Sequence, residues 1–247
     1  SGNYGCRSKT ARDPRRDRPV IDTKALRQKI LDLAIRGKLV PQDPDDEPAS
    51  VLLERIRQQK QQMVKEGKLK PKDIKNDSVI FVGEDNLHYE KFADGSVKCI
   101  EDEIPFDIPG SWAWTRIKTV SVDLPYGTSK KSNSSGKVAV LRMGNLQDGE
   151  IDYSDLVYSS DEADIEKYYL LENDLLFNRT NSAEWVGKTS IYRGDTPAIY
   201  AGYLIRIRTP LCGEYLNAVM NSSYAKNYCI RVKTDAVNQS NINAQKL

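Results

Sequence analysis

Residues 22–56 read DTKALRQKILDLAIRGKLVPQDPDDEPASVLLERI, and this stretch decides how the chain begins to fold. Asp22 can cap a helix N-terminus, and the apolar residues that follow it recur at helical spacing. Gly37 can adopt the left-handed conformation that ends a helix, and Pro41 prevents its continuation. The pattern predicts a helix over 22–36, followed by a turn-rich acidic connector.

A second helix is predicted after the connector. Pro48 suits the first helical position, and Gly67 marks the end. The helix needs a neighbour to bury its apolar residues, because isolated helices are marginally stable in water. Two interpretations remain open: the helices cap their own domain, or they form half of a coiled coil that is completed elsewhere. The candidate partner-contacting residues are Leu26, Ile30, Leu33, Leu52 and Ile56.

The pattern changes from helical to strand-like after Gly67. An apolar, β-branched run at 79–82 precedes a hairpin at 88–100 around Asp94-Gly95. Short apolar runs then recur between turn signals, and helical periodicity returns only near 213–226. The runs occupy 114–122, 137–143, 155–158, 168–177, 186–193 and 198–208. The pattern predicts an α+β fold, in which an N-terminal helical arm precedes a mostly β domain with a few helices.

This pattern divides the chain into four segments. They are a basic leader at 1–21, a helical segment at 22–67, a linker with a β-hairpin at 68–103, and a larger domain at 104–247. We expect the leader to be disordered. Its basic groups suit nonspecific phosphate binding, but they equally suit a plain disordered tail.

Composition excludes several classes of protein. The 247 residues are 39% hydrophobic, which suffices for one sizeable core and a smaller helical appendage. No window approaches about 18 consecutive apolar residues, so no membrane span is expected. The cysteines lack C-x-x-C spacing and His88 is the one histidine, so we expect neither a disulfide framework nor a zinc site. This cysteine usage favours a reducing, cytoplasmic location.

Three patterns resemble catalytic motifs but lack the context that catalysis needs. DLPY at 123–126 approximates the D/N-P-P-Y/F loop of amino-methyltransferases, but its second position is leucine. GKT at 187–189 matches the end of a P-loop, but Ser182 stands where that motif needs glycine, and the following residues resemble a strand. Acid-x-lysine triplets of the nuclease type, as at 22–24, have no convincing acidic partner upstream. We therefore expect no catalytic, cofactor-binding or metal-binding residue.

The larger domain has an uneven charge distribution. Six basic residues and one acid lie between Arg116 and Arg142, whereas ten acids and one base lie between Asp148 and Asp174. The domain could therefore present a basic face that attracts DNA and an acidic face that repels it. Many ordinary solvated surfaces also carry mixed charges, so this pattern alone is weak support for DNA binding.

Two polar stretches sharpen the hypothesis of DNA binding. Lysines and hydroxyls in the loop at 126–136 suit phosphate oxygens, and the candidates there are Gly127, Thr128, Ser129, Lys130 and Lys131. In the stretch at 178–182, Arg179 could pair with guanine or phosphate and Asn181 with adenine, with Ser182 beside them. The alternatives are a mobile surface loop and a turn that is capped by Asn and Ser side chains.

Several blocks of sequence carry a family resemblance. They are LRQKILDLAIRGKLVPQDPDDEPASVLLERI (26–56), EIPFDIPGSWAWTRI (103–117), VLRMGNLQDGEID (140–152), NDLLFNRTNSAEWVGKTSIY (173–192) and NQSNINAQKL (238–247). The third fits an R-x-x-N-x-x-x-G-x-I segment, which adds Arg142 and Asn145 to the DNA-contacting candidates. The fourth fits G-D-[IL]-L-x-x-R, with Asn173 in place of the usual glycine. Together these blocks resemble the specificity subunits of type I restriction–modification systems.

The resemblance implies a function. A full-length subunit of that family holds two recognition domains, spaced by long helices, and each reads one half of a split double-stranded DNA site. The chain would supply one recognition domain and part of the helical spacer, without catalysis. Its partners would be DNA, modification subunits and restriction subunits, and a homodimer through the arm is conceivable. S-adenosylmethionine, ATP and magnesium would belong to the partner subunits, so no cofactor is expected in this chain.

Overall fold

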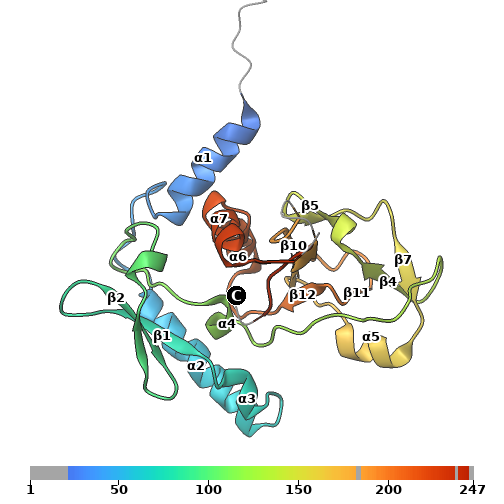
Figure 1. Ribbon diagram of the computed structural model, residues 1–247, viewed down its shortest axis with the longest axis horizontal. Coiled ribbons are helices and arrows are strands. Elements are labelled where there is room, and N and C mark those ends of the chain that lie inside the picture. The colour runs from blue at the N-terminus through green and yellow to red at the C-terminus, as the bar shows by residue number, and fades with distance from the viewer. Residues whose placement is uncertain (1–21, 182–184, 237–238, 245–247) are drawn as a thin grey trace, which may run out of the picture.

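The computed structural model describes residues 22–181, 185–236 and 239–244 (Figure 1). The described chain combines helices with several small sheets, which confirms the predicted α+β class. Two helices begin it, α1 (Thr23–Ile35) and α2 (Ala49–Lys65), close to the predicted positions. None of the described helices is long and apolar enough to cross a membrane.

The ends of α1 follow the capping signals of the sequence. The Asp22 carboxylate accepts a hydrogen bond from the backbone N–H of Ala25 at 3.0 Å, which satisfies a donor that the helix itself leaves free. Gly37 has a φ of +64°, and the N–H of Lys38 donates to the Leu33 carbonyl at 2.9 Å. These two features form a Schellman motif, so local chemistry accounts for both ends of the helix.

The second helix is also bounded by local signals. Gly67, with a φ of +74°, follows its last turn, and the N–H of Lys68 donates to the Met63 carbonyl at 2.9 Å. Pro48 is the capping residue rather than the first helical residue that was predicted, because its ψ of 139° is extended. Its carbonyl nevertheless accepts the first helical hydrogen bonds.

The helical arm, defined as α1 and α2, packs against the rest of the chain. α1 contacts α6 (Gly213–Met220) and α7 (Ser223–Val232), whereas α2 contacts α3 (Pro71–Ile74) and α4 (Ile117–Val120). In Figure 1, α1 lies above α6 and α7, and α2 lies below them. The arm therefore caps its own domain, which favours the first of the two interpretations of the sequence.

A three-stranded antiparallel sheet follows the arm in the sequence and precedes the larger domain. Its strands are β1 (Ser78–Val82), β2 (His88–Phe92) and β3 (Val97–Cys99), in that order. The chain turns between β2 and β3 at Gly95, whose φ is +85°. The predicted hairpin is thus confirmed.

Short strands in small sheets build the larger domain. β8 (Leu175–Asn178) lies between β10 (Thr189–Ile191) and β12 (Leu204–Ile207), and both neighbours are antiparallel to it. A second sheet places β4 at its centre and has the order β11-β4-β7. The remaining strands are β4 (Val138–Leu141), β5 (Leu146–Gln147), β6 (Glu150–Ile151), β7 (Val157–Ser159), β9 (Thr180–Asn181), β11 (Ala198–Tyr200), β13 (Thr234–Ala236) and β14 (Gln239–Asn241).

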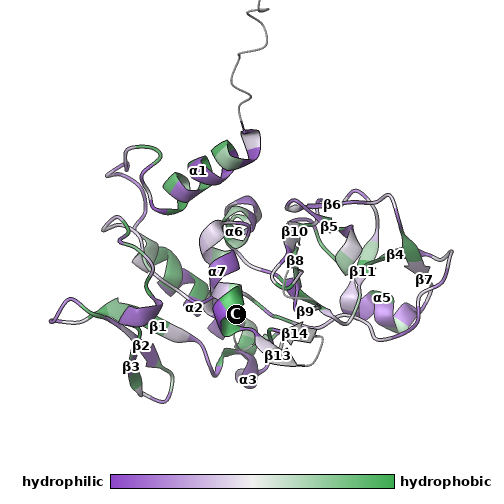
Figure 2. Cartoon of the chain, turned by 45° about the horizontal axis from the view of Figure 1, so that its top comes forward, coloured by the Kyte–Doolittle hydropathy of each residue, from purple (hydrophilic) through white to green (hydrophobic). Residues whose placement is uncertain are grey.

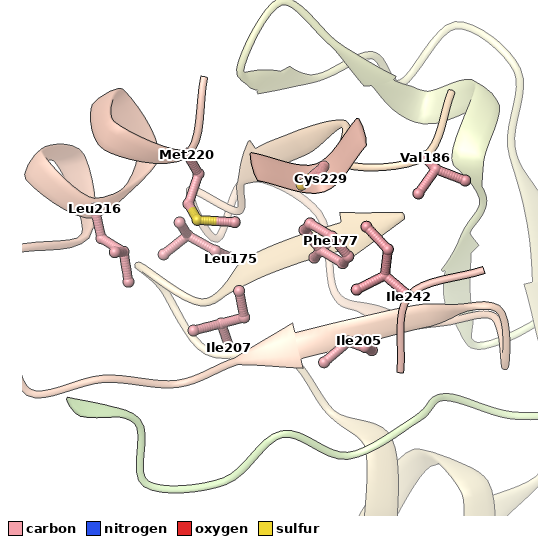
Figure 3. Close-up of a cluster of buried hydrophobic side chains, with 9 residues drawn as sticks. All are labelled: Leu175, Phe177, Val186, Ile205, Ile207, Leu216, Met220, Cys229 and Ile242. Carbon is pink, nitrogen blue, oxygen red and sulfur yellow. The ribbon is translucent and has the colours of Figure 1, made fainter. Parts of the chain in front are cut away.

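The hydrophobic core lies on both faces of β8. Leu175 and Phe177 pack beneath Met220 of α6 and Cys229 of α7 (Figure 3). Leu176 points the other way, into a cluster that includes residues of β4 and β11. Side chains alternate along a strand, so a strand buried on both faces must be apolar at successive positions.

Three helical regions differ from the sequence-based expectation. The polar helix α5 (Glu162–Tyr168), largely purple in Figure 2, was not predicted; the Asp161 carboxylate caps it by accepting the N–H of Asp164 at 2.9 Å. The apolar run at 114–122 forms a loop and the short helix α4 rather than a strand. The helical region predicted near 213–226 is two helices, because Ser222 caps α7 as a separate helix. Short 3-10 turns occur at Glu101–Glu103 and Met143–Asn145.

Candidate nucleic-acid interface

The loop after Tyr126 begins with two residues that the fold itself uses. A Cβ at Gly127 would overlap the carbonyl oxygen of Tyr200, so the close approach of the two backbones requires glycine. Thr128 is 6% exposed, and its hydroxyl donates to the Asp164 carboxylate. Both positions therefore hold the loop in place, and neither offers an accessible polar group to a ligand.

The two lysines of the loop differ in their surroundings. Lys130 Nζ lies 2.7 Å from Asp161 and 3.3 Å from Asp164, and the hydrogen bond with Asp161 raises the pKa of Lys130 above its ordinary value. Ser129 and Lys131 are exposed. Within the described residues, no carboxylate is paired with Lys131, so its charge is free to act on a ligand whereas that of Lys130 is compensated.

The expected separation into a basic and an acidic face is wrong. The basic segment and the acidic segment lie against each other, and carboxylates of the second neutralise cations of the first. Lys137 pairs with Glu162, and Arg142 Nη2 lies 2.7 Å from Asp155. Charges far apart in sequence cancel because β4 and β7 are neighbours in one sheet, which brings the flanking loops together.

Asn145 acts inside the fold, although the family segment had suggested it as a DNA contact. It is 3% exposed, and its side-chain oxygen accepts the Arg142 N–H at 2.8 Å. Its amide nitrogen donates to the carbonyls of Asp152 and Asp155, both at 2.9 Å. Both amide hydrogens and one lone pair of the oxygen are thus used to hold the turn after β4, so the donor that adenine recognition needs is not free.

Arg179 is the predicted DNA-contacting residue whose setting best suits that role. Its guanidinium carbon lies 4.6 Å from the centroid of the Tyr126 ring, and Nη1 donates to Asn241 Oδ1 at 3.3 Å. Its Nε is buried and has no hydrogen-bond partner among the described residues. The stack joins the loop at 126–136 to the stretch after β8, so two separately predicted polar stretches do come together.

The remaining candidates of this stretch are only partly visible. The backbone of Asn181 belongs to β9, which pairs with β14. Ser182 lies outside the described residues. Their suggested contacts with DNA stay predictions.

Sequence reasoning missed a second cation that is supported by an aromatic ring. Lys188 Nζ lies 3.9 Å from the centroid of the Trp185 ring. The lysine belongs to the GKT pattern that was rejected as a P-loop, and Thr189 after it begins strand β10. No helix N-terminus follows, so the rejection is confirmed. The available signal was the W-x-x-K spacing, which places an aromatic ring within reach of an ammonium group.

The candidate partner-contacting residues of the arm are unequally accessible. Leu26 is 49% and Ile30 44% exposed, whereas Leu33 and Leu52 are half-buried. Ile56 is 2% exposed, because its face of α2 packs within the chain. It therefore cannot be part of an accessible docking surface, and the exposed apolar stripe lies on α1.

An apolar cavity of about 180 Å³ is present between the arm and the larger domain. Its lining includes Ile35, Phe106, Trp114, Leu216 and Tyr224. This lining offers no nucleophile–base pair. Among the described residues, no group of three or more His, Cys, Asp or Glu side chains could hold a metal ion.

Comparisons with known proteins identify relatives of this chain. No family model matches the chain. It is 33% identical over 204 residues to the Escherichia coli type I restriction enzyme EcoAI specificity subunit, covering 80% of this chain and 30% of that protein. It is 29% identical over 234 residues to the EcoEI specificity subunit of Escherichia coli, covering 90% and 36%.

A third relative comes from another organism. The putative type I restriction enzyme MjaX specificity subunit of Methanocaldococcus jannaschii is 30% identical over 149 residues, covering 57% of this chain and 35% of that protein. The chain thus spans about a third of the length of the curated relatives it matches. The predicted resemblance is confirmed: along most of its length, the chain is a homologue of type I restriction enzyme specificity subunits.

Proposed function

We propose that this chain binds double-stranded DNA and reads one half of a bipartite target site. In this role it directs adenine methylation and restriction by partner subunits and catalyses neither reaction. The similarity to specificity subunits supports the proposal. S-adenosylmethionine, ATP and magnesium are assigned to the partner subunits, and the complex would act in the cytoplasm.

The observation that carries the proposal is the setting of Arg179. Stacking on Tyr126 and the bond to Asn241 restrict the side chain before any ligand arrives. Restricting it in advance lowers the entropy lost on binding. Its Nε is buried and out of reach of a ligand, so a contact with DNA would come from the terminal nitrogens of the guanidinium. Guanine O6 and N7 are acceptors that match an arginine fork, which makes Arg179 a candidate for base reading.

The exposed apolar side chains of α1 favour a second role for the arm. Leu26 and Ile30 lie one helical turn apart, so they form a continuous stripe. We propose that this stripe docks a helix of a partner, either a modification subunit or a second copy of the chain. Recognition and docking then occupy different parts of the chain, and Leu26→Glu with Ile30→Glu in the whole chain would test whether this stripe carries partner binding.

The test of DNA reading begins with selection of bound duplexes from a random library. Binding of wild type, Arg179→Ala and Arg179→Lys is then measured by fluorescence anisotropy on the selected duplex and on a scrambled one. A good bidentate base contact contributes about 1–3 kcal/mol to discrimination. We therefore expect Arg179→Ala to lower the ratio of the two affinities about 5- to 150-fold.

Three results would contradict parts of the proposal. Equal loss of affinity for both duplexes would make Arg179 a phosphate contact instead. Absence of binding to any duplex by the wild type at low salt would remove the function itself. Methylation or cleavage of DNA by the chain alone, incubated with S-adenosylmethionine and magnesium, would overturn the assignment of catalysis to partners.

A further inference from the structure

We infer that Lys188, supported by the indole ring of Trp185, is a backbone-phosphate anchor for DNA. The inference rests on the proposed function and adds a contact that sequence reasoning had not assigned. It also gives a role to the lysine of the GKT pattern, which is not part of a nucleotide-binding loop.

The position of Lys188 is determined by neutral groups. Its ammonium lies 3.9 Å from the Trp185 ring centroid, 3.3 Å from Gln147 Oε1 and 3.5 Å from the Leu146 carbonyl. Gln147 Nε2 donates to the Gly144 carbonyl at 2.9 Å, which orients the amide that Lys188 contacts. The indole supplies cation–π attraction without compensating the charge. Among the described residues, the ammonium is therefore held by neutral groups, which leave its positive charge uncompensated.

This arrangement differs from that of the cations in and directly after β12, a strand of the same sheet. Arg206 lies 2.7 Å from Asp123 and Arg208 2.5 Å from Asp174. Within the described residues, no carboxylate is paired with Lys188, although it is half-buried. A partly desolvated cation with only neutral partners gains most from an external anion. Phosphate is the anion that double-stranded DNA offers along its whole length.

A β-bulge directs Lys188 to this place. The N–H of Asn178 donates to the Lys188 carbonyl at 2.8 Å, while the Asn178 carbonyl accepts the N–H of Gly187 at 2.8 Å. Two residues of one strand thus oppose one residue of the other, and Gly187 has the φ of +93° that such a bulge favours. Bulges redirect side chains, and this one ends the regular pairing of β8 with β10 next to Arg179.

Arg179 and Lys188 both lie at the end of the β8–β10 pairing. Arg179 directly follows β8, and the Lys188 carbonyl accepts the N–H of the preceding residue, Asn178. The two side chains have different neighbours, since Arg179 contacts Tyr126 whereas Lys188 contacts β5. A base-reading guanidinium and a phosphate-binding ammonium would then approach different parts of one duplex.

The experiment compares Lys188→Met with a matched control, Lys167→Met. Lys167 also lies over an aromatic ring, 4.9 Å from the Tyr168 centroid, but it belongs to the acid-rich helix α5. Each variant removes one positive charge. Affinity for the selected and scrambled duplexes is measured between 50 mM and 200 mM salt, and circular dichroism melting confirms that each variant folds.

One phosphate contact contributes about 0.9 to the slope of log affinity against log salt, which corresponds to about 8-fold in affinity at 0.1 M salt. We expect Lys188→Met to lose this amount equally on both duplexes, Lys188→Arg to retain most of it, and Lys167→Met to lose little. An unchanged slope, a loss no larger than that of Lys167→Met, or a loss confined to the selected duplex would overturn the inference. Failure of the wild type to bind DNA would instead reject the proposed function.

Discussion

Replacement of Lys60 by methionine should test how the helical arm is joined to the larger domain. The side chain of Lys60 is 3% exposed, and its ammonium lies 2.6 Å from Asp77 Oδ2. It also donates to the carbonyls of Lys118 and Thr119, both at 3.1 Å. Burial lowers the pKa of Lys60 and raises that of Asp77, and the ion pair opposes both shifts. One ammonium thus connects α2, α4 and the segment before β1.

The expected loss of stability is large because the Asp77 carboxylate, whose side chain is only 17% exposed, would lose its cation. Removing one partner of a buried ion pair costs about 3–5 kcal/mol. For a chain of this size each kcal/mol lowers Tm by roughly 2–4 °C, so Lys60→Met should lower Tm by about 6–20 °C. Adding Asp77→Asn should recover about 1–3 kcal/mol, because the double variant no longer buries an unpaired charge.

Urea unfolding, followed by tryptophan fluorescence and circular dichroism, would measure these changes. Lys65→Met is the control, since Lys65 is exposed on the same helix and should change the free energy of unfolding by under about 1 kcal/mol. Coincidence of the two probes would support a two-state analysis. A loss below about 1 kcal/mol for Lys60→Met, or a double variant no more stable than that single one, would refute the reasoning.

The same variant should show a characteristic pH dependence. Burial already raises the pKa of Asp77 above its ordinary 3.8, and removal of Lys60 removes the groups that oppose the rise. A carboxyl with a raised folded-state pKa favours the folded state when protonated. The difference in free energy of unfolding between wild type and Lys60→Met should therefore be largest near pH 7. It should become smaller as pH falls through the raised pKa of Asp77.

Two further predictions follow from the ion pairs of the larger domain and the small sheet. Lys131→Ala should reduce the salt slope of DNA binding by about 0.9, because the charge of Lys131 is uncompensated. Lys130→Ala should reduce the slope less, and Asp161→Asn should increase it, because Asp161 compensates Lys130. Equal losses for the two lysine variants in anisotropy titrations would contradict this. Burial raises the pKa of Glu90, but hydrogen bonds from Arg116 and Ser78 outweigh this and hold it below its ordinary 4.5. The Arg116–Glu90 pair therefore stabilises the fold above about pH 4.5, and this contribution is lost as pH falls through the lower pKa that Glu90 has in the folded state. Between pH 6 and 3, the free energy of unfolding, measured with urea, should therefore fall more for wild type than for Arg116→Gln.

The helices of the arm could be predicted because their boundaries are set by neighbouring residues. Asp22 and Gly37 act on groups within one helical turn, so their effects are readable without knowing the rest of the fold. The hairpin at Gly95 was predictable for the same reason. Helix α5 escaped prediction because its sequence is largely polar, and its cap at Asp161 is a single short-range signal.

The candidate interface was less predictable because it depends on which charges meet. Lys130 and Lys131 are equivalent in sequence, but only the first lies next to Asp161. Asn145 suited base recognition by its chemistry, and the turn after β4 uses its hydrogen bonds instead. Lys188 was set aside with a failed nucleotide-binding motif, since the indole of Trp185 beneath it becomes relevant only once the bulge is formed.

The sequence by itself determined the family, the α+β class and the ends of the two arm helices, since all three depend on residue identity and short-range chemistry. Only the tertiary structure decided which cations keep their charge for a ligand. Compensation of one charge by another depends on their distance in space. Strand β7 and helix α5 pack beside β4 and beside the loop that precedes β4. This packing places Asp161 against Lys130 and Asp155 against Arg142. Among the described residues, Arg179 and Lys188 contact aromatic rings and neutral acceptors rather than carboxylates.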